Sequence, residues 1–76
     1  MNRGLKILII LFAVVAILFA AETGQSLFQK ALTKERAEAD PAGAIRLYER
    51  VVKEFGKDRR LAAEALFRIG ECHQTL

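Results

Sequence analysis

Apolar residues recur at helical spacing through the middle of the chain. From Ala44 onward they occupy positions i, i+3, i+4, i+7, i+8 and i+11, and charged residues fill most of the positions between them. This spacing predicts a helix with one apolar side and an opposite side in water. The apolar stripe comprises Ala44, Leu47, Tyr48, Val51, Val52 and Phe55. The solvated side comprises Arg46, Glu49, Arg50, Lys53 and Glu54.

Polar and turn residues mark both ends of this helix. Asp40 can cap its first turn, and Pro41 at the first helical position gives up only an N–H that has no partner there. Because proline disfavours helical backbone at the residue before it, a preceding helix has to stop at this point. At the other end, Gly56 is predicted to terminate the helix by adopting a left-handed backbone conformation as its cap.

A further helix is predicted after Asp58, which can cap its first turn. Its apolar face carries Leu61, Ala62, Ala65, Leu66, Ile69 and His73. Gly70 lies inside this helix, where a glycine costs about 1 kcal/mol relative to alanine. We therefore expect Gly70 to permit close contact with another helix.

The helix that precedes Asp40 has the weakest apolar pattern of the three. It is predicted over residues 27–39, and Ser26 with Gln29 fits a capping box at its start. The residues at helical spacing are Phe28, Ala31, Leu32 and Glu35. Charged residues indicate a large solvated fraction: Lys30, Lys34, Glu35, Arg36 and Glu38. With no strand pattern in the chain, the predicted fold is all-α, an N-terminal hydrophobic helix followed by a three-helix antiparallel array.

The first 21 residues predict an export segment. A short basic start, MNRGLK, precedes an unbroken apolar run over residues 7–21. This is the layout of a secretory signal peptide, and residues 5–21, with Lys6 included, are also just long enough for a membrane anchor. Both interpretations place the rest of the chain outside the cytoplasm. A cleaved signal is favoured over an uncleaved inner-membrane anchor, with residues 22–25 as a linker and residues 26–76 as the helical region.

Composition and charge exclude several classes of function. Arg3 and Lys6 account for two of the twelve Lys and Arg residues, which leaves ten against nine Asp and Glu in the rest of the chain. Because the signs alternate there, the basic face of a nucleic-acid-binding protein is not expected. The single cysteine rules out an internal disulfide.

No catalytic or metal-binding arrangement can be assembled from the reactive residues. Cys72 and His73 are adjacent, so on a helix they point about 100° apart, and the chain has no other Cys or His to complete a metal site. Glu35, Glu38 and Asp40 lie among basic residues and are interpreted as solvated surface. No enzyme, cofactor or metal is expected. One open hypothesis is that Cys72 links two chains in an oxidising compartment.

The two clearest helices resemble part of a tetratricopeptide-repeat array. Ala44, Tyr48 and Val51 fall where the second helix of such a repeat has small, aromatic and small residues. The third helix matches the first helix of a following repeat at Leu66, Ile69, Gly70 and His73. The FGKDRRLAAEAL join is similar to joins in repeat proteins of the bacterial cell envelope, such as the Tol–Pal-associated periplasmic protein and the barrel-assembly lipoprotein.

The resemblance implies about one and a half repeats over residues 26–76, in the envelope type of tetratricopeptide-repeat protein. It departs from the repeat pattern at Leu32, where Gly is usual, at Gly56, where Pro is frequent, and at His73, where Tyr is usual. Helix pairs of this family pack on one another and bind peptides on a concave surface. The packing residues it implies are Ala44, Tyr48, Val51, Phe55, Leu66, Ile69, Gly70 and His73.

The function expected from these features is a non-enzymatic protein–protein interaction module in the periplasm or cell envelope. Its expected partner is a protein or peptide, with membrane contact through residues 1–21 if the leader stays attached. Neither nucleic acid nor a small-molecule substrate is expected. Two alternatives remain: a single-pass membrane-anchored helical protein, and the N-terminal piece of a longer secreted repeat protein whose function lies downstream.

Overall fold

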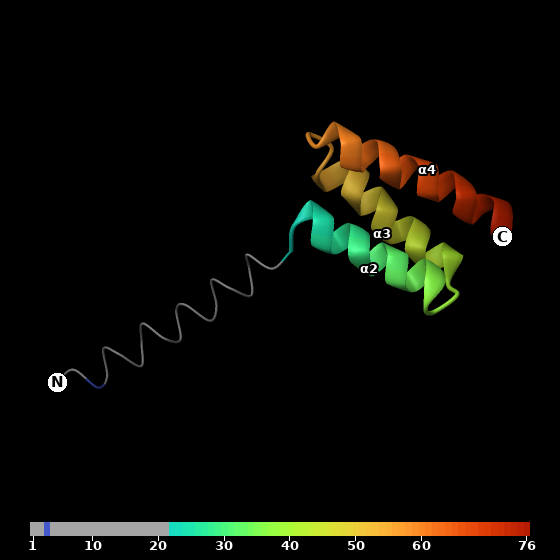
Figure 1. Ribbon diagram of the computed structural model, residues 1–76, viewed down its shortest axis with the longest axis horizontal. Helices are drawn as coiled ribbons and strands as arrows, with labels where there is room; N and C mark the ends of the chain where they lie inside the picture. The colour runs from blue at the N-terminus through green and yellow to red at the C-terminus, as the bar shows by residue number, and fades with distance from the viewer. Residues whose placement is uncertain (1–2, 4–21) are drawn as a thin grey trace.

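Three helices form the part of the chain that can be described. The computed structural model describes Arg3 and residues 22–76. The helices are α2 (Gly24–Arg36), α3 (Pro41–Glu54) and α4 (Arg59–Thr75), with no strand among the described residues. They run antiparallel in chain order, and α3 packs against both neighbours while α2 and α4 touch only slightly (Figure 1). The all-α prediction is therefore confirmed for this part of the chain.

The predicted leader, residues 1–21, lies outside the described residues apart from Arg3. Within the described part, none of the helices has the length and apolar character needed to cross a membrane.

The first helix begins earlier than the sequence pattern predicts. Thr23, and not Ser26, is the N-cap of α2: its hydroxyl accepts from the Ser26 N–H at 3.0 Å, and the Ser26 hydroxyl accepts from the Thr23 N–H at 2.8 Å. This reciprocal pair is a capping box one turn upstream of the predicted one. The predicted linker spans residues 22–25, and two of these residues, Gly24 and Gln25, therefore belong to α2.

The turn between α2 and α3 is fixed by backbone hydrogen bonds and by Asp40. The Asp40 N–H donates to the Lys34 carbonyl at 2.8 Å, and Ala39 adopts a left-handed φ of 50°. Asp40 then caps α3 as predicted, since its carboxylate accepts from the Gly43 N–H at 2.9 Å, and Pro41 begins the helix.

The prediction of a left-handed cap at Gly56 is wrong. No described glycine has a positive φ, and α3 ends at Glu54 with Phe55 as its C-cap. Gly56 is required for a different reason: a Cβ there would lie 2.6 Å from the Val52 carbonyl oxygen, too close for any side chain. Asp58 caps α4 as predicted, through its bond to the Leu61 N–H at 3.2 Å.

The core lies along both faces of α3. Tyr48, Val51, Ala44 and Leu27 have no exposed surface. The Phe28 and Tyr48 rings meet edge to face with centroids 5.3 Å apart, a favoured arrangement for aromatic pairs. The remaining buried apolar residues are Phe28, Ala31, Ile45, Leu61, Ala65 and Cys72.

Candidate interaction surface

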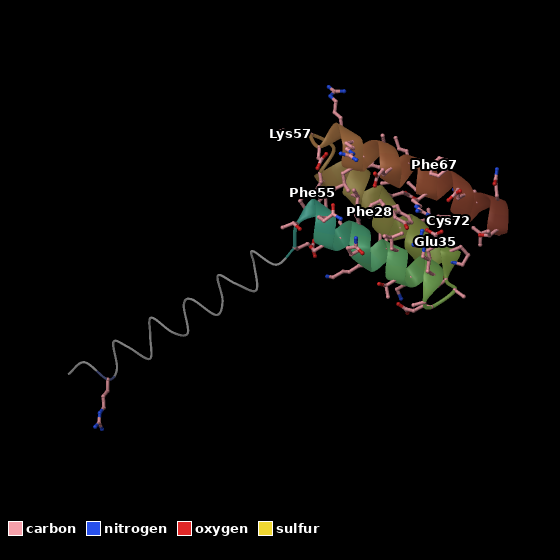
Figure 2. The ribbon with its side chains drawn as sticks, in the orientation of Figure 1. Phe28, Glu35, Phe55, Lys57, Phe67 and Cys72 are labelled. Carbon is pink, nitrogen blue, oxygen red and sulfur yellow. The ribbon has the colours of Figure 1, made fainter. Side chains whose placement is uncertain are left out.

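Two large apolar side chains on the outer side of α4 are exposed to solvent. Leu66 is 57 % exposed and Phe67 is 66 % exposed. Figure 2 places Phe67 on α4, on the side away from α2. A single exposed leucine needs no explanation, but two adjacent large residues form a patch that water solvates poorly.

A groove between α3 and α4 adjoins this patch. It encloses about 450 Å³, and Val52, Leu66 and Ile69 supply its apolar lining. Val52 and Ile69 are half-buried and also contact the core, so the groove is continuous with the interior packing. Its other lining residues are charged and all belong to α3: Arg46, Glu49, Arg50 and Lys53.

The predicted packing residues divide into an inner and an outer group. Ala44, Tyr48 and Val51 are fully buried, and Phe55 and Ile69 are half-buried against the core. The outer group comprises Leu66, Gly70 and His73, all of them exposed. Nothing in the described part comes within 4 Å of a Cβ placed at Gly70, so the described helices do not make the close contact expected there.

A polar cluster joins the three helices on the inside. The Tyr48 hydroxyl of α3 donates to the Glu35 carboxylate of α2 at 2.7 Å. Arg68 of α4 lies 3.9 Å from the other Glu35 oxygen and 3.4 Å from Glu71. Burial raises the pKa of the Tyr48 hydroxyl, and the bond to Glu35 raises that pKa further.

The interpretation of Glu35 as solvated surface is therefore wrong. Its side chain is only 20 % exposed, and it bonds to one neighbouring helix and pairs with the other. A signal was present in the sequence, because Glu35 continues the spacing of Phe28, Ala31 and Leu32 on the buried side of the helix. The other two carboxylates, Glu38 and Asp40, serve an ion pair with Lys34 and the cap of α3.

Cys72 lies inside the same cluster, next to Glu35 (Figure 2). Its side chain is buried at 1 % exposure, and burial followed by the charge of Glu35 raises the pKa of the thiol. A buried thiol that stays protonated is a poor nucleophile. The hypothesis of a disulfide between two chains is contradicted, because the folded unit keeps this sulfur out of reach. No three His, Cys, Asp or Glu side chains of the described residues gather into a possible metal site.

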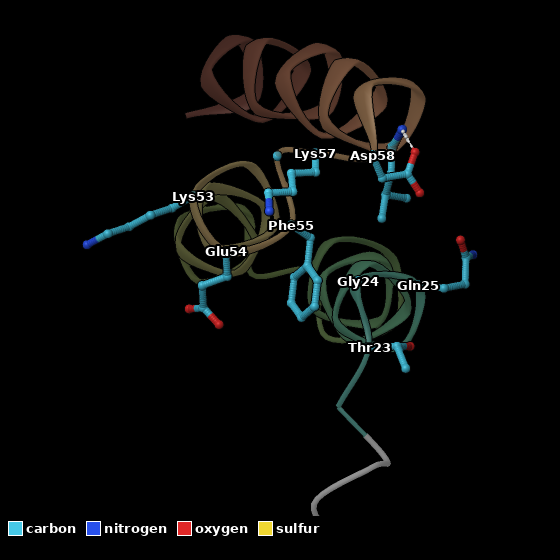
Figure 3. A pocket seen from close by; sticks show the side chains of 10 residues that line it. Thr23, Gly24, Gln25, Lys53, Glu54, Phe55, Lys57 and Asp58 are labelled. Atoms are coloured by element: carbon cyan, nitrogen blue, oxygen red, sulfur yellow. Dashed lines mark hydrogen bonds between the residues drawn. The ribbon is translucent and has the colours of Figure 1, made fainter.

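A second hollow lies where the start of α2 meets the end of α3. Figure 3 shows the Phe55 ring between α3 and the start of α2, with Lys53 and Lys57 around the rim. A Cβ at Gly24 would come within 3.1 Å of Phe55, so glycine lets the two helix ends approach closely. The hollow encloses about 820 Å³ and is a junction between helix ends.

Ion pairs fasten the start of α2 to the outer side of α3. Arg50 bonds to Glu22 and, at 2.8 Å, to Glu54. The bond from Arg50 lowers the pKa of the Glu54 carboxyl. The sequence pattern placed Arg50 and Glu54 on the solvated side, and both are exposed enough for the pairs to be weak individually.

Comparison of the chain with protein-family models, with curated proteins and with solved structures finds no match.

Proposed function

We propose that the chain is an exported, non-enzymatic protein–protein interaction module of the tetratricopeptide-repeat type. The observation that carries this proposal is the outer side of α4, where Leu66 and Phe67 are exposed beside an apolar groove. Apolar patches rimmed by polar residues are typical of protein contact sites. The repeat type is supported by three antiparallel helices with short turns and by the small and aromatic residues Ala44 and Tyr48 in the core.

The energetic basis is the apolar surface left in water. Burying a leucine or phenylalanine side chain contributes roughly 1.5–3 kcal/mol relative to leaving it exposed. A partner that covers Leu66 and Phe67 would recover this free energy, and the groove beside Leu66 offers a depression for that partner's side chains. Large aromatic residues in well-packed pockets often dominate such contacts.

Site-specific photo-crosslinking in cells that make the full chain tests the proposal. A photoreactive residue at Leu66 or Phe67 should give a discrete crosslinked protein band. The matched control is Lys30, which is exposed on α2, and it should give none. If positions 66 and 67 give no more product than position 30, the proposed contact surface is wrong.

The proposed location is the periplasm or cell envelope, with the leader removed. The support is the basic start and apolar run of residues 1–21. Mass spectrometry of the mature chain shows where it begins, and this decides between a cleaved leader and a retained one. A chain that starts near Glu22 or Leu27 supports secretion, whereas a chain that keeps residues 1–21 supports the membrane-anchored alternative.

A further inference from the structure

Cations gather at the end of the helical bundle where the leader joins it. The segment around the turn from α3 to α4, residues 53–60, carries four cations and two anions, whereas residues 34–40 at the opposite end carry two cations and three anions. The start of α2 lies at the same end as the first segment, because Thr23 and Lys57 line one hollow (Figure 1, Figure 3). We call the four cations the basic end: Lys53, Lys57, Arg59 and Arg60.

The anions at this end of the bundle are engaged by other groups. Glu22 and Glu54 both pair with Arg50. The Asp58 carboxylate accepts from the Leu61 N–H as the cap of α4. The four cations of the basic end are exposed, and none of them forms an ion pair with another described residue. Their charge is therefore available to an anionic partner.

Helix stability does not account for Arg59 and Arg60. They occupy the first two positions of α4, where free N–H groups form the positive end of the helix dipole. Cations are unfavourable there, and although Asp58 caps the helix, its first turn has no acidic residue. Lys53, by contrast, suits the negative end of α3. An external anion would therefore stabilise the two arginines in a way that the fold does not.

The length of the chain between the leader and α2 brings a membrane next to the basic end. The apolar run ends at Ala21, and Thr23, the N-cap of α2, follows two residues later. Two residues span at most about 7 Å, so a bilayer that holds the leader lies within this distance of the start of α2. Anionic lipids attract Lys and Arg over about one Debye length, about 8 Å at physiological ionic strength. A nucleic acid or an acidic protein would gain nothing from an apolar leader, so the leader favours a membrane among anionic partners.

We propose that the basic end binds the anionic headgroups of a phospholipid membrane. The contact is electrostatic: ammonium and guanidinium groups face lipid phosphates, and a guanidinium can bind a phosphate through two parallel hydrogen bonds. The turn between α2 and α3 then points away from the membrane, because it lies at the other end of the bundle (Figure 1). The inference applies while residues 1–21 are attached, and it does not depend on a protein partner for the outer side of α4.

Photo-crosslinking of the full chain to lipid in vesicles tests the proposal. A photoreactive residue at Lys57 reports contact between the basic end and lipid. The control position is Ala37, which is exposed and follows α2 at the opposite end of the bundle. The vesicles contain either phosphatidylcholine alone or phosphatidylcholine mixed with the anionic phosphatidylglycerol. Lipid adducts at position 57 should be at least about fivefold more abundant in the anionic vesicles, and position 37 should give no such increase.

Removing charge from the basic end separates attraction from mere proximity to the bilayer. In Arg59→Gln with Arg60→Gln, the adduct yield at position 57 in anionic vesicles should fall at least about fivefold. The matched control pair, Lys34→Gln with Arg36→Gln, removes the same charge from the opposite end and should leave the yield unchanged. Vesicle flotation checks that every variant is membrane-bound through its leader, and circular dichroism checks that it is helical.

Three outcomes would overturn the lipid contact: equal adduct yields in the two kinds of vesicle, an unchanged yield in Arg59→Gln with Arg60→Gln, or an equal loss in the control pair. A protein adduct at position 57 in cells, in place of a lipid adduct, would also overturn it and would assign the basic end to an acidic protein. None of these results bears on the outer side of α4, which is tested separately by the crosslinks at Leu66 and Phe67.

Discussion

A hydrogen bond between Tyr48 and Glu35 joins α3 to α2. The tyrosine ring has no exposed surface, and its hydroxyl reaches the carboxylate at 2.7 Å. A buried hydroxyl has to find a partner, because leaving it unpaired costs more than the bond contributes. The sequence shows an aromatic residue in an apolar stripe and a carboxylate in a charged segment, and their meeting depends on how α2 and α3 pack.

Tyr48→Phe should lower the free energy of unfolding by about 1–2 kcal/mol, since it removes the donor to a partly buried carboxylate. Urea unfolding followed by circular dichroism measures the change. Glu35→Gln and the double variant complete the cycle, in which the two effects should not be additive. Additive effects would show that the pair contributes nothing jointly.

Cys72 and Tyr48 should make the fold sensitive to alkaline pH. Both have a raised pKa in the folded chain, so the unfolded chain loses these protons first as pH rises. Their contribution is therefore fully present below the ordinary thiol pKa of about 8.5 and declines above it. Urea midpoints between pH 7 and about pH 10 should fall, and fall less steeply in Cys72→Ala. Equal slopes for the two proteins would exclude the thiol as a cause.

At the scale of the helices, the two glycines Gly56 and Gly70 have opposite roles. A side chain at Gly56 would collide with the Val52 carbonyl oxygen, which belongs to the backbone and cannot turn aside. Gly70 lies inside α4 with open space around it in the described part. Gly56 is therefore required by the turn after α3, whereas Gly70 lowers the stability of α4.

Gly56→Ala should therefore lower the free energy of unfolding by about 1 kcal/mol or more. Gly70→Ala should raise it by up to about 1 kcal/mol, the difference in helix propensity between the two residues. Thermal or urea unfolding of the pair provides its own control, because the chemical change is identical. A gain for Gly56→Ala would contradict the close contact with Val52.

Much of the helical architecture could be predicted because local chemistry determines it. Asp40, Pro41 and Asp58 act within one turn of their own positions, and the stripe from Ala44 to Phe55 lies on the buried side of α3. The start of α2 was misplaced because Thr23 and Ser26 are both hydroxyl residues suited to capping, and only the backbone path selects between them.

The groove could not be predicted from the pattern in the same way. Its lining combines Val52 with Leu66 and Ile69 from another helix, so it depends on the angle and register of α3 and α4. Phe67 lies outside the apolar face predicted for its helix, and the spacing of apolar residues gave no indication that it would be exposed. Sequence periodicity identifies which side of a helix is apolar, whereas the depth of burial depends on tertiary packing.

At the scale of the whole molecule, α3 is covered on two sides and α4 on one. The core continues from α2 through α3 to the inner side of α4, and there the described apolar packing gives way to exposed Leu66 and Phe67. An apolar edge of this kind gains stability when another helix covers it. This asymmetry is the basis of the proposed interaction role.

The central claim is that another protein contacts the outer side of α4, and the most direct measurement is the crosslinking yield from a photoreactive residue at Ala63. Ala63 is exposed on α4 one turn from Leu66 and Phe67, so both apolar residues stay available for substitution. The yield in the full chain should fall at least about tenfold in Leu66→Ser with Phe67→Ser, because apolar contacts worth more than 1.4 kcal/mol are lost. Gln29→Ser with Lys30→Ser on α2 should leave it unchanged. An undiminished yield in the α4 variant, with its free energy of unfolding intact, would contradict the account.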